Sequence, residues 1–309
     1  MGLENIAIAI ETGKMGQAFS CLMIDTVPDC CVFGYTQCFP LYTYDRVEEQ
    51  SRSRKTALID SQSDGCGSDG ERVGDYIRRE NISDVTLQKF REHYSDKKIT
   101  KEDIFYYVYG ILHSRNYRER FAADLKKQLP RIPMVGTSGE FQVASDENED
   151  CSPHATNPST LFWTFSKAGR QLAELHLNYE TGKMYPVIEV WGQGFGDSPK
   201  PLSPESYRMT KMRFPSKTDK SKIIYNDQLH LAGIPAEAYR YIVNGKSALE
   251  WIMERYAVTT HKDSGIVNDP NDWCKEIGNE RYIVDLIKRI VHLSVESVKI
   301  IDGLPEVRF

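Results

Sequence analysis

Several features are scarce or missing in this chain, and each absence argues against a class of protein. In the segments expected to be helical, the longest uncharged apolar stretch runs from Ile104 to Leu112. That is about half of the roughly 20 residues that a membrane-spanning helix requires, so we expect no membrane segment. The N-terminus carries Glu4 where a secretory leader would carry positive charge. These absences predict a cytoplasmic protein.

Paired cysteine motifs are also missing. The seven cysteines are Cys21, Cys30, Cys31, Cys38, Cys66, Cys151 and Cys274. No C-x-x-C pair occurs among them, and an odd number cannot all pair within one chain, which favours reduced thiols. A zinc site assembled in the fold from distant Cys and His residues is the open alternative.

Positive charge is in deficit overall but is concentrated locally. The chain has 39 Lys and Arg against 44 Asp and Glu, a net charge of -5, which argues against coating nucleic acid by bulk charge. Residues 208–222 nevertheless carry +5 and residues 115–131 carry +4. Such patches could contact phosphates, although ordinary solvated surface explains them equally well. The candidate DNA-binding residues are Arg208, Lys211, Arg213, Lys217, Lys220, Lys222, Arg115, Arg118, Lys126 and Lys127.

Motifs for catalysis are incomplete. The glycine-rich stretch 65–70 lacks the preceding buried strand of a dinucleotide site. The stretch Asn244-Gly-Lys-Ser247 has Arg240 where a phosphate-binding loop needs its first glycine, which favours a turn followed by a helix cap. No (Asn/Asp)-Pro-Pro-(Tyr/Phe) tetrapeptide and no Glu-x-Lys occur. We therefore predict no catalytic, cofactor or metal site in this chain.

The first half of the chain predicts short strands followed by helices. Residues 5–42 carry short apolar runs separated by Gly and Pro turns, which is typical of strands. Residues 45–75 are polar and predict a loop. Helical spacing begins after Ser83, a candidate N-cap, and a relaxed capping box at Thr100 precedes an apolar helix that belongs in a core. A further helix is expected over 115–129.

The second half predicts a sheet and then helices. The runs LFWTFS, YPVIEVW, YRMTKMRF and SKIIYN are typical of strands, interrupted by one helix around Gly169 to Leu175. Ser247 opens a capping box, and an apolar stripe from Arg281 to Lys299 predicts a long helix. The expected fold class is α+β, with an irregular, mostly antiparallel central sheet flanked by N-side and C-terminal helical lobes.

One predicted strand contains the more basic stretch. In YRMTKMRF, strand alternation would place Arg208, Thr210 and Met212 on one face. Met209, Lys211 and Arg213 would then lie on the other. A basic hairpin of this kind suits phosphate contacts and the reading of guanine in a groove. The alternative is an exposed edge strand that its lysines protect against aggregation.

Several segments resemble one family of enzymes. They are residues 104–133, 169–180, 207–214, 241–273 and 282–305, together with residues 4–42. The first five resemble the C-terminal target recognition region of Type ISP restriction-modification enzymes. Residues 4–42 are similar to the stretch that joins the methyltransferase core to that region. The resemblance spans nearly the whole chain in the expected order.

The resemblance implies a recognition module rather than a complete enzyme. It implies a strand-rich junction over 1–50, a polar loop or linker over 51–80, and a target recognition domain over 81–309. Within that domain we expect helices at 81–133, mixed β structure at 134–240 and helices at 241–309. The implied partners are double-stranded DNA and the methyltransferase and helicase-like domains of the parent enzyme. S-adenosylmethionine, ATP and Mg²⁺ are implied only for the full enzyme.

A second function of a different class stays open. The chain could be a docking module of a split or decayed restriction-modification system. An exposed apolar patch on the IAIAI to CFPLY region, residues 6–42, would favour that interpretation.

Overall fold

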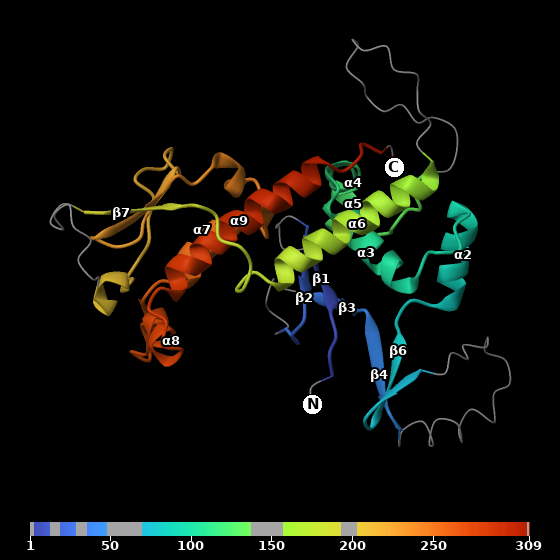
Figure 1. Cartoon of the computed structure of the whole chain (residues 1–309), viewed down its shortest axis with the longest axis horizontal. Coiled ribbons are helices and arrows are strands. Elements are labelled where there is room, and N and C mark those ends of the chain that lie inside the picture. Colours follow the sequence, from blue (N-terminus) through green and yellow to red (C-terminus); the bar gives the residue numbers. More distant parts are fainter. Residues whose placement is uncertain are drawn as a thin grey trace, which may run out of the picture. The chain divides into compact units, whose positions relative to one another are not determined.

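The chain folds into two compact units in the computed structural model (Figure 1), which describes residues 3–12, 19–28, 36–47, 70–136, 157–192, 203–307 and 309. Unit 1 comprises Met1–Leu177 with Gly303–Phe309, and unit 2 comprises Asn178–Asp302. Within the described ranges, no helix is long and apolar enough to cross a membrane. The division into two compact units does not show where a junction or a recognition domain begins. The predicted boundaries at residues 50 and 80 therefore stay predictions.

Unit 1 contains two small antiparallel sheets. One has the order β2-β1-β3 and the other β4-β6-β5. Their strands are β1 (Ala7–Glu11), β2 (Ser20–Ile24), β3 (Gln37–Pro40), β4 (Tyr42–Arg46), β5 (Glu71–Val73) and β6 (Tyr76–Glu80). The predicted strands within residues 5–42 are confirmed wherever the structure describes them. The stretch CVFGY lies outside the described residues.

The prediction of a loop over residues 51–80 is wrong for its last ten residues. These form β5 and β6, which pair with each other, and β6 also pairs with β4. The strands are only partly buried, and contacts such as Arg78 over the ring of Tyr42 at 4.5 Å help to hold them together. A search for apolar runs misses strands that pair through polar and aromatic side chains. Residues 51–69 lie outside the described residues.

The helices of unit 1 follow their capping signals. They are α2 (Asp84–Tyr94), α3 (Lys101–His113), α4 (Arg115–Arg120), α5 (Ala122–Leu125) and α6 (Pro158–Leu177). Ser83 caps α2, and the capping box of Thr100 with Asp103 begins α3, so both predictions are confirmed. The single helix predicted over 115–129 is instead two short helices that meet at Phe121.

The prediction of a strand at LFWTFS is wrong, because residues 161–166 lie inside α6. Leu161, Phe162, Phe165 and Leu172 are buried at helical spacing. Packing against α3 overrides the strand preference of this aromatic run, and the ring of Phe162 stacks on that of Tyr107 at 5.1 Å. The helix predicted around Gly169 to Leu175 is the second half of α6.

Two glycines allow α3 and α6 to approach closely (Figure 1). A Cβ atom at Gly169 would lie 1.9 Å from the carbonyl oxygen of Tyr106. A Cβ atom at Gly110 would lie 2.2 Å from the carbonyl oxygen of Phe165. Both contacts are with backbone, which cannot rotate away. The helix pair therefore depends on the absence of these two side chains.

Unit 2 is built around one long helix and a three-stranded antiparallel sheet of order β7-β9-β8. Its elements are β7 (Ile188–Trp191), η1 (Pro204–Tyr207), β8 (Lys222–Ile224), β9 (Leu229–Ala232), η2 (Ala236–Tyr239), β10 (Ile242–Val243), β11 (Lys246–Ser247), α7 (Ala248–Arg255), β12 (Thr259–Thr260), β13 (Val267–Asn268), α8 (Pro270–Glu276) and α9 (Tyr282–Asp302). Strands β10 and β11 form one hairpin, and β12 and β13 another.

Most predictions for this unit are confirmed. YPVIEVW and SKIIYN contain β7 and β8, Ser247 caps α7 through a capping box, and α9 covers the predicted apolar stripe. Asn244 and Gly245 form the turn before that cap, as expected for a turn rather than a phosphate loop. The antiparallel character of the α+β fold is confirmed. The described strands, however, form five small sheets instead of one central sheet.

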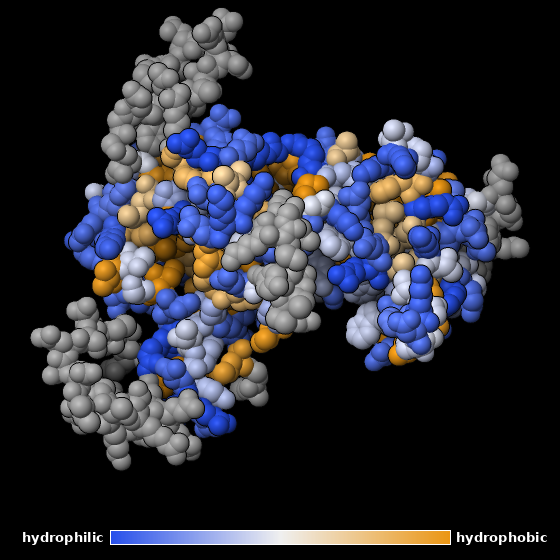
Figure 2. Space-filling view, turned by 180° about the vertical axis from the view of Figure 1, so that it is seen from behind, coloured by the Kyte–Doolittle hydropathy of each residue, from blue (hydrophilic) through white to orange (hydrophobic). Residues whose placement is uncertain are grey.

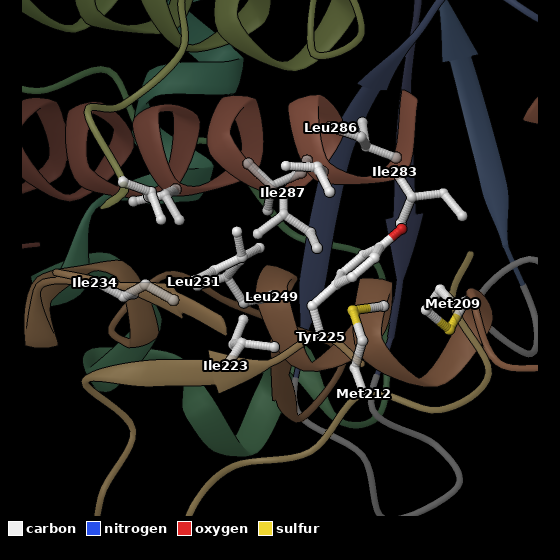
Figure 3. Close-up of a cluster of buried hydrophobic side chains, with 14 of the residues drawn as sticks. Met209, Met212, Ile223, Tyr225, Leu231, Ile234, Leu249, Ile283, Leu286 and Ile287 are labelled. Atoms are coloured by element: carbon white, nitrogen blue, oxygen red, sulfur yellow. The ribbon is translucent and has the colours of Figure 1, made fainter. Parts of the chain in front are cut away.

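The core of unit 2 lies between α9 and the sheet (Figure 3). Ile283, Leu286 and Ile287 form the buried face of α9. They pack with Leu231 of β9 and with Tyr225, both fully buried. Met209 and Met212 belong to the same cluster, so the segment that carries the basic residues is anchored in this core.

We predict that Gly169→Ala lowers the free energy of unfolding of unit 1 by about 1–3 kcal/mol, the usual cost of overpacking. In a helix without this close neighbour, Gly→Ala would stabilise the protein by about 1 kcal/mol. A loss of stability instead of a gain therefore indicates the contact between α3 and α6. Chemical denaturation measures the effect. Lys167→Ala, at an exposed neighbouring position of α6, is the matched control and should change little. An unchanged or raised unfolding midpoint for Gly169→Ala would contradict the close packing.

Candidate nucleic-acid interface

The basic segment, residues 208–222, is not the regular strand predicted for its first half. Met209 and Met212 are both buried, at 0% and 4% exposure, although alternation would place them on opposite faces. Lys211 and Arg213 are exposed. In the first half of the segment, the strand-like pairing among the described residues is one antiparallel bridge, in which the N–H and C=O of Arg213 bond those of Ile224 at 3.1 and 2.8 Å. The prediction of alternating faces is therefore wrong.

Two side chains and one backbone amide take the place of a neighbouring strand at residues 208–210, which explains the lost alternation. The amide of Asn271, itself buried, accepts a hydrogen bond from Met209 N at 2.9 Å and donates one to Met209 O at 2.7 Å. Asn226 Nδ2 donates to the carbonyl of Arg208 at 3.0 Å. Val258 N donates to the carbonyl of Thr210 at 2.9 Å. These bonds hold the backbone from 208 to 210 in one conformation.

Arg208 is held by an acidic partner. Its Nη2 lies 2.6 Å from Asp269 Oδ2, and the side chain of Asp269 is only 13% exposed. Burial acts to raise the pKa of Asp269, but hydrogen bonds from Asn271 and Arg208 outweigh it and lower the pKa below its ordinary value. Asp269 is therefore charged at neutral pH, and it neutralises much of the charge of Arg208.

Lys220 is also paired within unit 2. Its Nζ lies 2.7 Å from Glu250 Oε1, and it sits over the rings of Phe214 and Tyr239 at 5.4 and 5.5 Å. Glu250 belongs to the capping box with Ser247 and stays charged, because the bonds from Lys220 and Ser247 outweigh burial and lower its pKa. Lys220 thus fixes the end of the basic segment against α7.

Three cations of the segment point into solvent without an acidic partner. Within the described parts of the chain, no ion pair involves Lys211, Arg213 or Lys217, and all three are exposed. Lys222 is half-buried in β8. Hydrogen bonds from Ser221 are the main cause of the lowered pKa of Asp219. The nearby charge of Lys222 lowers that pKa further. The available positive charge is therefore concentrated at 211, 213 and 217.

The second group of basic residues belongs to unit 1. Arg115, Lys126 and Lys127 are exposed at or just beyond α4 and α5. Arg118 is different: its Nε donates to the carbonyl of Leu112 at 2.5 Å, and its Nη2 donates to the buried Cys21 Sγ at 3.4 Å. The guanidinium of Arg118 is thus occupied by contacts inside the unit.

The charge of Arg118 acts on two buried histidines nearby. Burial lowers the pKa of His176 to about 3, and the charge of Arg118 adds to that effect. The pKa of His113 is lowered by burial first and by the charge of Arg118 second, and the neighbouring His176 lowers it further. Both rings are therefore neutral in the folded chain. Tyr109 links the pair, with its hydroxyl 2.6 Å from His176 Nδ1 and its carbonyl 2.9 Å from His113 Nδ1.

The sequence analysis missed a hairpin next to the basic segment. Residues 259–268, which include β12 and β13, are exposed throughout. The turn residues Asp263-Ser-Gly265 between two short β-prone runs are the sequence signal that could have revealed it. Beside α8 lies a surface hollow of about 480 Å³, lined among others by Tyr207, Arg208 and Asn271.

Within the described ranges, no group of three or more His, Cys, Asp or Glu side chains is placed to hold a metal ion. The residues 65–69 of the glycine-rich motif lie outside the described part of the chain. Hydrophilic side chains cover much of the face of unit 2 that Figure 2 shows, interrupted by small hydrophobic areas. The main features of the surface of unit 2 are the basic segment, whose backbone is held by hydrogen bonds, and the exposed hairpin joined to it.

Comparison with known proteins identifies relatives of the whole chain. The family model described as the Type ISP C-terminal specificity domain matches residues 1–286. No match was found among curated proteins. The ATP-dependent Type ISP restriction-modification enzyme LlaBIII bound to DNA is similar, with a TM-score of 0.72 and 28% identity over 99% of this chain and 16% of that chain.

Two further solved structures are similar over nearly the whole chain. A nuclease-deletion mutant of the Type ISP enzyme LlaGI in complex with a DNA substrate mimic has a TM-score of 0.66 and 29% identity, covering 100% of this chain and 22% of that chain. The DrdV–DNA complex has a TM-score of 0.69 and 28% identity, covering 99% and 25%. This chain thus spans a quarter or less of the length of these solved chains.

We predict that Asn271→Ala lowers the free energy of unfolding of unit 2 by about 1–3 kcal/mol, because it leaves both polar groups of the buried Met209 backbone without a partner. Chemical denaturation of the full chain measures the loss. Lys275→Ala, at an exposed position of the same helix, is the control and should stay within about 0.5 kcal/mol of the parent. Equal stability of the two variants would mean that the amide does not hold the segment.

Proposed function

Because the chain belongs to the Type ISP C-terminal specificity domain family, we propose that it recognises a target sequence in double-stranded DNA for a restriction-modification enzyme. The observation that carries the proposal is the likeness of nearly the whole chain to enzymes solved with DNA bound. A rigid basic segment on an acidic chain supports it, since phosphate contacts position a protein on the duplex.

The phosphate contacts are assigned first to Lys211, Arg213 and Lys217. They are exposed and pair with no carboxylate in the described part of the chain, which leaves their charge available, and the neighbouring backbone is already fixed. Lys222 extends this row, and in unit 1 the exposed residues Arg115, Lys126 and Lys127 are proposed as further contacts.

Three of the ten predicted residues are less suited to phosphate. Arg208 and Lys220 would have to leave Asp269 and Glu250, and the largely buried Asp269 would lose its compensating charge. Arg118 would have to break its bonds to Leu112 and Cys21. We propose that these residues contact DNA weakly at most and mainly hold their surroundings in place.

The rest of the enzyme's activity is proposed to lie in other domains. A methyltransferase that uses S-adenosylmethionine to modify a flipped adenine, and a helicase-like motor that uses ATP and Mg²⁺, would act at the site that this chain selects in the cytoplasm. The short span of this chain relative to the similar enzymes supports the division.

No observation favours the docking alternative. It expected an exposed apolar patch over residues 6–42, but Ile8, Ala9, Ile10 and Leu41 are buried. Val27, at 98% exposure, and Phe39, at 38%, are the large apolar side chains that the described part of this region exposes. Large apolar residues that are exposed one at a time along the chain are ordinary on a protein surface.

The proposal is tested by enrichment of a randomised duplex DNA pool on the full chain at near-physiological salt, followed by sequencing of the bound fraction. We expect a short asymmetric motif. Salt-sensitive retention without a motif would contradict sequence recognition by this chain, and no retention would remove DNA as its ligand.

We also predict that Lys211→Ala and Arg213→Ala weaken binding to all sequences alike. Each lost phosphate contact should reduce the slope of log Kobs against log salt by about one. Binding titrations at four or five salt concentrations measure the slope. Lys183→Ala removes an exposed lysine of unit 2 outside the basic segment and serves as the control. If both variants keep the control's slope, these side chains do not contact phosphate.

A further inference from the structure

The hairpin at residues 259–268 has no structural role in the core. All ten of its residues are exposed, including Ile266 at 67% and Val267 at 58%. Its strands β12 and β13 have two residues each, paired as Thr259 with Asn268 and Thr260 with Val267. An isolated hairpin of this size is marginally stable at best, so its shape must be fixed by other bonds.

The tip of the hairpin is shaped by bonds within the turn. His261 N donates to the carbonyl of Ile266 at 2.8 Å, and Gly265 N donates to the carbonyl of His261 at 2.9 Å. Ser264 Oγ lies 3.0 Å from His261 Nδ1. Gly265 has a φ of +67°, which a residue with a side chain adopts only at a cost. The tip is therefore held in one conformation before any ligand binds.

Both ends of the hairpin are joined to the basic segment. On one side Val258 N bonds the carbonyl of Thr210 at 2.9 Å. On the other side Asp269 bonds Arg208, and the next residue but one, Asn271, bonds both polar groups of Met209. Figure 1 shows α8, which follows the hairpin, beside the N-terminal end of α9. The hairpin and the side chains of Lys211 and Arg213 are thus carried by one rigid frame.

The hairpin also offers the chemistry that base reading requires. Lys262 supplies a donor, Asp263 an acceptor, and Asn268 both, while Thr260, Ile266 and Val267 present methyl groups of the kind that contact thymine. The four residues from Thr259 to Lys262 span at most about 13 Å at roughly 3.3 Å per extended residue. The major groove is about 8.5 Å deep and wide enough for a two-stranded ribbon.

We infer that hairpin β12–β13 enters the major groove of the target DNA and reads base edges, while the basic segment beside it contacts the phosphates. The inference rests on the proposed function and deepens it, because it assigns sequence discrimination to residues 260–268 and affinity to residues 211–217. The bonds of Thr210 and Asp269 join the hairpin to the basic segment and so fix the position of one relative to the other.

The test uses the full chain and a variant with a shortened hairpin. Residues 261–266 are replaced by Asn-Gly, a two-residue turn that retains the pairing of Thr260 with Val267 and leaves the anchors of the hairpin intact. Both proteins are challenged with the randomised duplex pool. Their affinities are then measured for the parent's enriched motif and for a scrambled duplex, across a range of salt.

We expect the shortened variant to keep its salt slope and its affinity for scrambled DNA. Its preference for the motif over scrambled DNA should fall by tenfold or more. Lys262→Ala and Asn268→Ala should each reduce that preference at particular positions of the motif, whereas Lys211→Ala lowers both affinities equally. Circular dichroism and the unfolding midpoint verify that the variants are folded.

The outcomes separate this inference from the proposed function. If the parent enriches a motif and the shortened variant prefers that motif to the same extent, the hairpin does not read bases, although the chain still recognises DNA. A variant that loses affinity for scrambled DNA together with its salt slope would make the hairpin a backbone contact and would also overturn the inference. If the parent itself enriches no motif, the proposed function fails and the inference fails with it.

Discussion

The buried amide of Asn271 is the interaction on which the candidate interface depends. It satisfies both polar groups of the Met209 backbone, which pairs with no strand in the ranges that the structure describes. Because a buried polar group without a partner costs about 1–3 kcal/mol, the segment is held where this amide lies. The same amide bonds Asp269, which in turn caps α8 and pairs with Arg208. One side chain therefore links the basic segment, the end of the hairpin and α8.

A partly buried charge cluster performs a similar task at the opposite edge of the sheet. Glu189 of β7 lies 2.7 Å from Arg281 and 2.6 Å from Lys288, and Arg281 also donates to the hydroxyl of Tyr207 at 2.6 Å. Burial raises the pKa of Glu189, but the bonds from the two cations outweigh it and keep the carboxyl charged. Ion pairs at exposed or buried positions add little net stability, so the main consequence of this partly buried cluster is orientation. It fixes η1, and with it the start of the basic segment, relative to α9.

Electrostatics in this chain is local, because the charges that matter are those left without a partner. The total of -5 says little about binding, since Asp269 and Glu250 neutralise particular cations, whereas Lys211, Arg213 and Lys217 pair with no carboxylate among the described residues. Pairing thus divides the ten candidate residues into groups with different tasks. Arg118 illustrates this point, because it carries the same charge as its basic neighbours but its guanidinium donates to Leu112 and Cys21 inside unit 1.

Features that arise from residues close together in the chain could be predicted from the amino-acid sequence. The capping boxes at Thr100 and Ser247 and the apolar stripe of α9 were all predictable, because their signals lie within one helix. The family resemblance was equally visible, since it depends on the order of whole segments. Tertiary packing, by contrast, makes LFWTFS helical, and its partner α3 lies more than 40 residues away in the sequence. Three partners of the basic segment, Val258, Asp269 and Asn271, are likewise distant in sequence. Local periodicity therefore could not show which cations are free or that a hairpin stands beside them.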